Sequence, residues 1–183
     1  MIHAETILRT LDRSLDQSIP LVLYGRAALA LGFDHPPEEA CLSLDVDVIL
    51  TLAQAHQLDG NDAFWDALDA TNRELAPSGL YVTHLFVEDQ VILRPQWQDY
   101  LVPLHFSGLR HLQLSRPHVL DLLLTKMMRG ADPQDMADAA FLLRQPEAQG
   151  TGLPDLFAQA RVPDVPEIRT LFAEAQRIVL SLR

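Results

Sequence analysis

An apolar run that ends in a single glycine is the feature that most constrains how this chain folds. Residues 21–24 are apolar, Gly25 follows them, and residues 26–33 are rich in alanine and leucine. A short apolar run closed by glycine is typical of a buried strand, and the alanine-rich stretch is typical of a helix. Because glycine allows a tight turn, the sequence predicts a strand that passes directly into a helix.

A second strand is predicted at residues 44–50, where polar and apolar residues alternate. The alternation places Asp45 and Asp47 on one face, with roughly 7 Å between their Cα atoms. Two carboxylates at that spacing repel each other unless water solvates them, one keeps a proton, or a divalent cation lies between them. Taken alone, the pair therefore fits a solvent-facing strand as well as a metal site.

The rest of the chain contains further helical and strand-like periods. Before residue 115 they predict helices at residues 3–17 and 61–75, and strands at residues 80–87, 91–93, 100–106 and 111–114. After residue 115 they predict only helices, beginning at Pro117, Pro133 and Leu153 and ending with a helix whose capping box spans residues 164–167. The last helix carries a continuous apolar stripe that we expect to be buried.

The expected fold class is α+β, with a small mixed sheet and flanking helices followed by a C-terminal helical subdomain. Residues 1–115 would form the α/β core with its N-terminal helix, and residues 116–183 the helical subdomain packed on it. A chain of 183 residues is long enough to bury a core of its own.

Charge and cysteine content narrow the classes of function. The chain has 25 acidic and 14 basic residues, a formal net charge of -11, which disfavours nucleic-acid binding without a local basic patch. Its one cysteine, Cys41, excludes an internal disulfide and a cysteine-rich zinc site, and fits a reducing compartment. No run approaches the roughly 20 apolar residues of a membrane span. We therefore expect a cytoplasmic protein with no membrane partner.

The strand, glycine turn, alanine-rich helix and Asp-x-Asp strand together resemble the nucleotidyltransferase superfamily, which has a polymerase-beta-like fold. Downstream, residues 121–130 and the acidic residues 132–138 resemble the helical segment of bacterial nucleotidyltransferase-like proteins allied to the AbiEii-type toxins. In that segment a helix lysine precedes an acidic helix. The resemblance covers roughly residues 18–144.

The resemblance implies a nucleoside triphosphate as ligand and Mg2+ or Mn2+ as cofactor. Gly25 would form the turn around the phosphates, and Asp45 and Asp47 would bind the metal. Arg26 replaces the small residue that usually follows the glycine, and it would either grip a phosphate or crowd the nucleotide. The acceptor of the nucleotidyl group stays unknown, with a protein side chain, a small molecule and an RNA end all open.

Two residues of the helical segment are also candidates for nucleotide binding. Lys126 would neutralise phosphate charge, although a surface lysine lying along apolar neighbours is an equal alternative. Asp138 is a better candidate than Asp135, because Asp135 lies in the first turn of a helix capped by Asp132 and helix electrostatics already explain it.

One departure from the family pattern leaves the activity open. Active members carry a third carboxylate on a later strand, but residues 81–87 contain no acid, and Thr83 and His84 lie in its place. His84 is therefore the candidate catalytic base, and Glu88 would serve only if the strand ran longer or bent inward. The alternative is a catalytically silent module that binds nucleotide or a protein partner. A glycosyltransferase using Asp-x-Asp for a sugar nucleotide ranks last.

Overall fold

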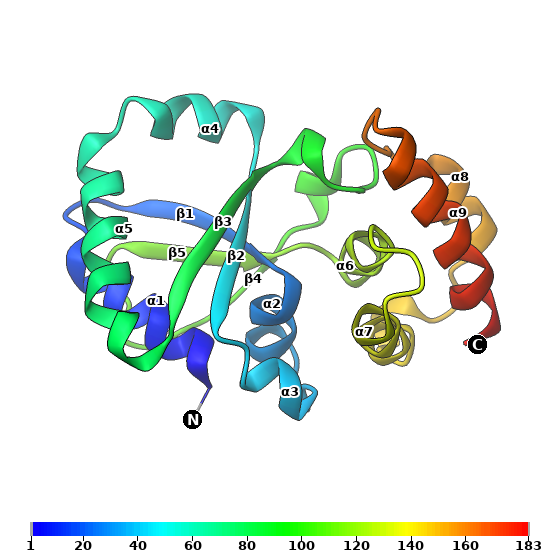
Figure 1. The fold of residues 1–183 in the computed structure, drawn as a ribbon, viewed down its shortest axis with the longest axis horizontal. Helices are drawn as coiled ribbons and strands as arrows, with labels where there is room; N and C mark the ends of the chain where they lie inside the picture. Colours follow the sequence, from blue (N-terminus) through cyan, green and yellow to red (C-terminus); the bar gives the residue numbers. More distant parts are fainter. Residues whose placement is uncertain (1, 183) are drawn as a thin grey trace. The chain divides into compact units, whose positions relative to one another are not determined.

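The computed structural model describes residues 2–182, which form two compact units (Figure 1). The first unit runs to Glu88 and also includes Val102–Arg116. The second unit contains Asp89–Leu101 and the chain after Arg116. The predicted fold class is confirmed as α+β, with a five-stranded mixed sheet, flanking helices and a C-terminal helical region. Within residues 2–182, no helix combines the length and apolar character needed to cross a bilayer.

The sheet belongs to the first unit and has the strand order β3-β2-β1-β5-β4. Its strands are β1 (Ile19–Tyr24), β2 (Asp45–Leu50), β3 (Tyr81–Val87), β4 (Val102–Pro103) and β5 (Leu112–Arg116). Strand β1 runs antiparallel to β2 and parallel to β5, while β3 runs parallel to β2. The predicted adjacency of the first two strands is therefore confirmed. The side chains of Val46, Val48 and Ile49 on β2 are buried in the core.

The helices of the first unit are α1 (His3–Ser14), α2 (Gly25–Gly32), α3 (Glu38–Cys41), α4 (Leu52–Asp59) and α5 (Asp62–Leu75). Helix α1 buries Ile7, Leu8 and Leu11, as its helical period predicts. Helix α4 was not expected from the apolar pattern. It begins with a capping box in which Thr51 accepts from the N–H of Gln54 and the Gln54 side chain accepts from the N–H of Thr51.

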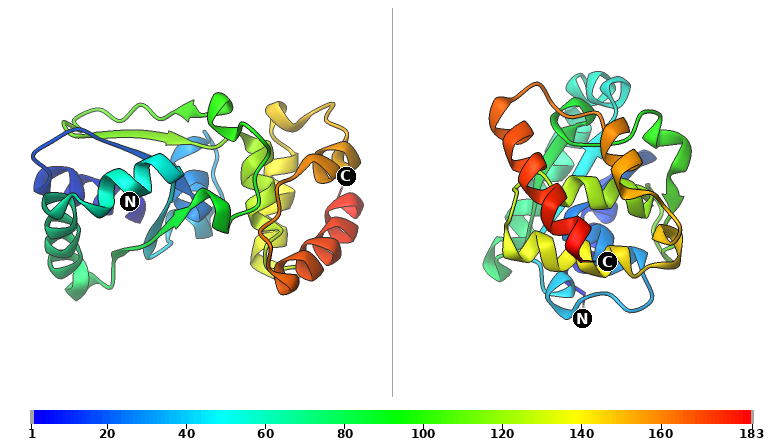
Figure 2. Two further views of the ribbon diagram at one scale, coloured as in Figure 1. Left: turned by 90° about the horizontal axis from the view of Figure 1, so that it is seen from above. Right: turned by 90° about the vertical axis from the view of Figure 1, so that its right-hand side faces the viewer.

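The second unit contains α6 (Val119–Lys126), α7 (Pro133–Leu143), α8 (Leu153–Gln159) and α9 (Pro166–Ser181). Helix α7 packs on both α6 and α9 (Figure 2). Helix α7 starts as predicted, with Asp132 accepting a hydrogen bond from the N–H of Asp135 and Pro133 in the first turn. Helix α6 begins later than expected, because His118 caps it in place of Pro117.

The prediction for the last helix is wrong in two respects. No capping box forms, because Pro166 occupies the first turn and Asp164 pairs with Arg169 instead. Only part of the apolar stripe is core: Phe172 and Val179 are buried, whereas Leu182 is 39% exposed. Leu182 is the C-cap residue, so it lies beyond Ser181, the last residue of α9.

Two predicted strands are also corrected. Residues 91–93 form no strand, and Leu93 makes a single bridge to Arg161 within the second unit. The next residue, Arg94, forms an ion pair with the fully buried Asp121 of α6 at 2.7 Å, which draws the segment toward that helix. The strand expected over residues 100–106 is reduced to β4, because Tyr100 belongs to a 3-10 helix instead, and beyond Pro103 only the N–H of Leu104 still bonds to β5, at the carbonyl oxygen of Leu114.

A carboxylate of α1 anchors the start of β5. Asp12 is 4% exposed and accepts hydrogen bonds from the backbone N–H groups of Arg110, His111 and Leu112, with the shortest at 2.8 Å. Burial raises the pKa of Asp12, but these three donors outweigh it and hold the pKa below its usual range. The carboxylate therefore stabilises the folded state only while it is ionised.

We expect Asp12→Asn to lower the free energy of unfolding by about 2–3 kcal/mol at pH 7, because the amide places its own donors against backbone donors. Since the folded pKa is depressed, the stabilisation is present above the unfolded pKa of about 4 and is lost as the pH falls through the folded pKa. The difference between variant and wild type should therefore shrink below about pH 4, as measured by urea unfolding across pH. The control is Asp16→Asn, at an exposed position beyond the same helix. An equal loss in both variants would contradict this account of Asp12.

Candidate functional site

The site begins at the junction of β1 and α2. Gly25 is the first residue of α2 and adopts φ +62°, a conformation that favours glycine. A Cβ at this position would lie 3.3 Å from Oδ2 of Asp47. The strand register explains this closeness, because Tyr24 pairs directly with Asp47. The glycine turn and the Asp47 carboxylate therefore lie side by side.

Asp45 and Asp47 occupy alternate positions of β2 and are both half-buried, whereas Val46 between them is buried. The Asp45 carboxylate accepts hydrogen bonds from Ser43 Oγ at 2.8 Å and from Thr83 Oγ1 at 3.1 Å. Hydroxyl donors on both oxygens offset part of the repulsion between the two carboxylates. The alternation predicted from sequence is thus present, with a set of hydroxyl partners that it did not predict.

A bulge in β3 shapes the other side of the site. Between two successive pairs, β2 advances from Val46 to Val48 while β3 advances from Val82 to Leu85. One residue of β2 thus faces two residues of β3, as in a β-bulge, which re-aims side chains. The two residues of β3 in this bulge are Thr83 and His84. Thr83 contacts Asp45, and His84 lies beside Asp47.

His84 is the second residue of that bulge. Its Nδ1 lies 3.7 Å from Oδ1 of Asp47, and its side chain is 63% exposed. Its ring lies against Phe86, which in turn meets Tyr24 edge-on. The ring therefore lies beside a carboxylate and is reachable from solvent, as a proton acceptor requires.

Glu88, the other acid considered from sequence, has a structural contact. It follows the last residue of β3, is 7% exposed, and its Oε1 accepts a hydrogen bond from the N–H of Leu52 at 3.0 Å. Leu52 is the first residue of α4, so the carboxylate lies at a helix N-terminus, where negative charge is stabilising. The strand neither runs longer nor bends inward to place Glu88 among the aspartates.

Arg26 is held by α3. Its guanidinium forms an ion pair with Glu39 at 3.2 Å and also donates to the carbonyl oxygen of the same residue. This contact ties the start of α2 to α3. A phosphate-binding role for Arg26 stays a prediction.

The side chains near Asp45 and Asp47 determine what kind of Mg2+ site this part of the chain can form. Within residues 2–182, no group of three or more His, Cys, Asp or Glu side chains is arranged to hold a metal ion. Mg2+ commonly binds through one or two carboxylates and completes its shell with water and substrate phosphates. Asp45 and Asp47, with the hydroxyls that orient Asp45, fit a site in which two carboxylates hold Mg2+ and water and phosphate oxygens complete its shell. They do not form a site in which protein side chains alone surround the ion.

The candidates of the second unit lie in a buried ionic cluster. Lys126 pairs with Asp138 at 2.7 Å and with Asp135 at 3.2 Å, and its side chain is 9% exposed. Arg129 also pairs with Asp135. Lys126 is thus on a buried face and is not a surface lysine. These opposite charges compensate one another inside the unit, which accounts for their burial.

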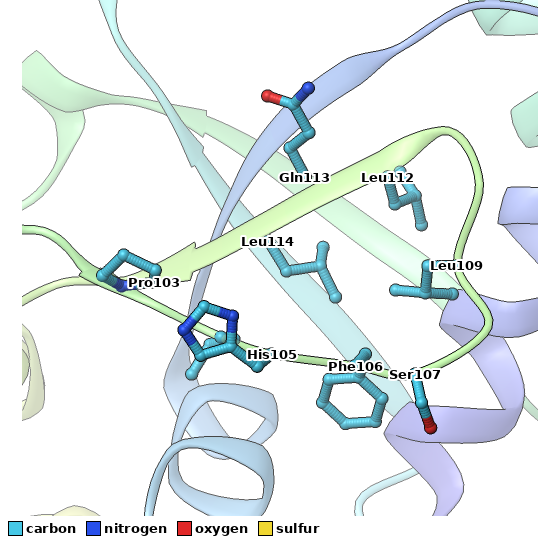
Figure 3. Close-up of a pocket in the computed structure, with 9 residues that line it drawn as sticks. Pro103, His105, Phe106, Ser107, Leu109, Leu112, Gln113 and Leu114 are labelled. Carbon is cyan, nitrogen blue, oxygen red and sulfur yellow. The ribbon is translucent and has the colours of Figure 1, made fainter.

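The first unit also has an open cavity of about 590 Å³ that contains none of the predicted site residues. Figure 3 shows Leu112 and Leu114 of β5 pointing toward Phe106 and Leu109 of the preceding loop, while Gln113 points to the other side. The cavity wall therefore combines apolar side chains with the polar side chains of His105, Ser107 and Gln113. None of its lining residues is acidic.

Sequence reasoning missed Ser43, although a signal was present. Ser43, Asp45 and Asp47 stand at alternate positions, so a period of two already places all three on one side.

Comparisons of the chain with protein-family models, with curated proteins and with solved structures gave no match.

We expect Gly25→Ala to lower the free energy of unfolding by about 1–2 kcal/mol, because the left-handed conformation strains a residue with a Cβ. The close approach of that Cβ to Asp47 adds to the cost. The matched control is Gly60→Ala, where φ is negative and no atom lies within 4 Å of the added Cβ. Urea unfolding of both variants measures the difference. A Gly25→Ala protein as stable as Gly60→Ala would show that the turn tolerates a side chain.

Proposed function

We propose that this chain is a metal-dependent nucleotidyltransferase that binds a nucleoside triphosphate with Mg2+ and transfers a nucleotidyl group to an acceptor. The observation that carries the proposal is Gly25 at φ +62°, abutting the Asp47 carboxylate on the neighbouring strand. The N–H groups in the first turn of α2 suit phosphate oxygens, and the missing side chain leaves them room to approach. The resemblance of the sequence motifs around Gly25, Asp45 and Asp47 to the nucleotidyltransferase superfamily supports the same assignment.

Each residue of the first unit has a defined task in this proposal. Asp45 and Asp47 hold Mg2+, which neutralises phosphate charge and polarises the reacting phosphoryl group when bound. Ser43 and Thr83 orient the Asp45 carboxylate through their hydrogen bonds. His84, near Asp47 and open to solvent, accepts the proton of the attacking hydroxyl.

A second candidate function is a catalytically silent module that binds nucleotide or a protein partner. The observation that favours it is the lack of an acid in β3, together with the engagement of Glu88 by α4. A missing third carboxylate weakens activation of the nucleophile more than it weakens retention of the triphosphate. Binding without transfer is the expected behaviour of such a protein.

The roles proposed for Lys126 and Asp138 in nucleotide binding stay predictions. Each already has a partner, since the two form an ion pair with each other. A phosphate that engaged Lys126 would compete with Asp138 and Asp135. The primary tests of nucleotide binding therefore use residues of the first unit.

We expect a triphosphate with Mg2+ to raise the melting temperature, because a ligand that binds only the native state stabilises it. At a concentration 100 times the Kd the added stability is about 2.7 kcal/mol. Asp47→Ala should abolish the metal-dependent part of the shift, whereas Asp66→Ala, at an exposed position of α5, should retain it. Thermal unfolding with each of the four ribonucleoside triphosphates, with Mg2+ or Mn2+, makes the measurement. If none of them changed the melting temperature of the wild-type protein, the proposed nucleotide site would be wrong.

Transfer to external acceptors should be slow in the wild type, because β3 offers Thr83 and His84 where an acid is expected. Loss of a general base typically costs about 100-fold or more, so His84→Ala should abolish most of the remaining transfer. Thr83→Asp should raise it by adding a carboxylate beside Asp45. Label transfer from an α-labelled triphosphate measures all three proteins.

Two results of this assay would argue against an active enzyme or against the assigned base. Robust wild-type transfer that His84→Ala leaves untouched would show that another group accepts the proton. Wild-type and Thr83→Asp proteins that bind the triphosphate but transfer no label would favour the silent module.

A further inference from the structure

A second, smaller cavity of the first unit has a wall made of neutral polar groups. Its volume is about 230 Å³, and it lies between the start of β1, helix α4 and the start of α5. All of its lining residues fall within residues 17–61, and none of them is charged. The polar ones are Gln17, Ser18, Gln54, Gln57 and Asn61. A charged ligand would find no counterion in this wall, so the cavity favours a neutral ligand with hydrogen-bonding groups.

Backbone donors fix the orientation of two of these amides. The N–H of Thr51 donates to Gln54 Oε1 at 3.0 Å, and the N–H of Phe64 donates to Asn61 Oδ1 at 3.1 Å. A backbone N–H pairs with the oxygen of a side-chain amide and not with its NH2 group, so neither amide can flip. Among residues 2–182, neither NH2 group has a hydrogen-bond acceptor. Both NH2 groups therefore remain donors for a ligand.

Gln17 is oriented in turn by Asn61. Its Nε2 donates to Asn61 Oδ1 at 3.0 Å, which leaves the carbonyl oxygen of Gln17 as an acceptor. The Ser18 hydroxyl, which accepts from Gln113 Nε2 at 2.9 Å, and the exposed amide of Gln57 can adapt to a ligand. The groups with a fixed orientation are thus two donors and one acceptor.

The ligand edge that complements this set has two acceptors and one donor. Uracil has two carbonyl oxygens and the N3 hydrogen on its pairing edge, and cytosine has O2, N3 and its exocyclic amine. Guanine has the opposite set, and adenine has one donor and one acceptor. We propose that this cavity binds the base of a pyrimidine nucleoside. The apolar lining residues Ile19, Pro20 and Leu58 suit the faces of such a ring.

The size and the place of the cavity both set it apart from the proposed triphosphate site. Its volume is below the roughly 300–1,000 Å³ of most ligand pockets, so it suits a single ring. It borders Pro20, near the start of β1, whereas Gly25 follows the last residue of that strand. At about 3.3 Å per residue, roughly 17 Å of strand separates the two. The inference therefore goes beyond nucleotidyl transfer and needs neither Mg2+ nor Asp47.

Two substitutions remove the oriented donors and keep the helix caps. Gln54→Glu keeps an oxygen for the N–H of Thr51, as in the common capping box, and Asn61→Asp keeps one for the N–H of Phe64. Each replaces an NH2 donor with an oxygen that repels the acceptors of the base. We expect each to weaken pyrimidine nucleoside binding at least about tenfold without a large change in melting temperature.

The experiment titrates each of the four ribonucleosides, without phosphate or Mg2+, into the full chain. Nitrogen–proton NMR spectra follow the side-chain NH2 signals of Gln54 and Asn61 and yield the Kd. Uridine or cytidine should move both signals and bind at least about fivefold more tightly than adenosine and guanosine. The matched control Gln159→Glu adds the same charge at an exposed position at the end of α8, and should bind like the wild type. Uridine 5′-monophosphate should bind no more tightly than uridine.

Several outcomes would overturn the inference. They are equal affinity for purine and pyrimidine nucleosides, unchanged binding in Gln54→Glu and Asn61→Asp, and NH2 signals that no nucleoside moves. Much tighter binding of the monophosphate would also do so, because it would place the ligand at a phosphate site. Asp47→Ala separates the two proposals, since it should bind uridine like the wild type while losing the Mg2+-dependent response to triphosphate. Loss of uridine binding in Asp47→Ala would contradict a separate site.

Discussion

The left-handed turn at Gly25 is the constraint on which the rest of the first unit depends. Because Gly25 takes φ +62°, the chain leaves β1 and enters α2 without a connecting loop. The same position lies against the Asp47 carboxylate, where a side chain would be crowded. One glycine thus determines both the start of a helix and the room beside a carboxylate. A ligand that binds there would meet helix N–H groups and an acid together.

The molecule compensates like charges in two different ways. In the first unit, Asp45 accepts hydrogen bonds from two hydroxyl groups and stays half-buried. In the second unit, Asp135 and Asp138 are buried and form ion pairs with Lys126, and Asp135 also pairs with Arg129. Charges that neutralise one another in the interior contribute to a unique packing, whereas charges that keep accessible oxygens suit chemistry.

The bulge in β3 decides what kind of chemistry the aspartates meet. Without it, strict alternation would direct Thr83 and His84 to opposite faces. With it, Thr83 reaches Asp45 and His84 reaches Asp47. The site thereby has hydroxyl and imidazole groups in place of a third carboxylate. That substitution is why we expect the proposed transfer to external acceptors to be slow.

The sequence by itself determined the features that depend on neighbours along the chain. A period of two placed Asp45 and Asp47 on one side of a strand, and Asp132 with Pro133 marked the start of α7. These features are local because dihedral preferences and hydrogen bonds within one turn produce them.

Only the tertiary structure decided three features: the register of β3, the hydrogen bond from the N–H of Leu52 in α4 to Glu88, and the ion pair of Lys126 with Asp138. The bulge depends on how two strands far apart in sequence align, and no period within either strand records that alignment. Glu88 and Leu52 are 36 positions apart in the sequence, so their contact depends on how α4, α5 and β3 are arranged in the fold. Such contacts are set by packing between distant segments, which is why composition and spacing predicted the aspartates but not their partners.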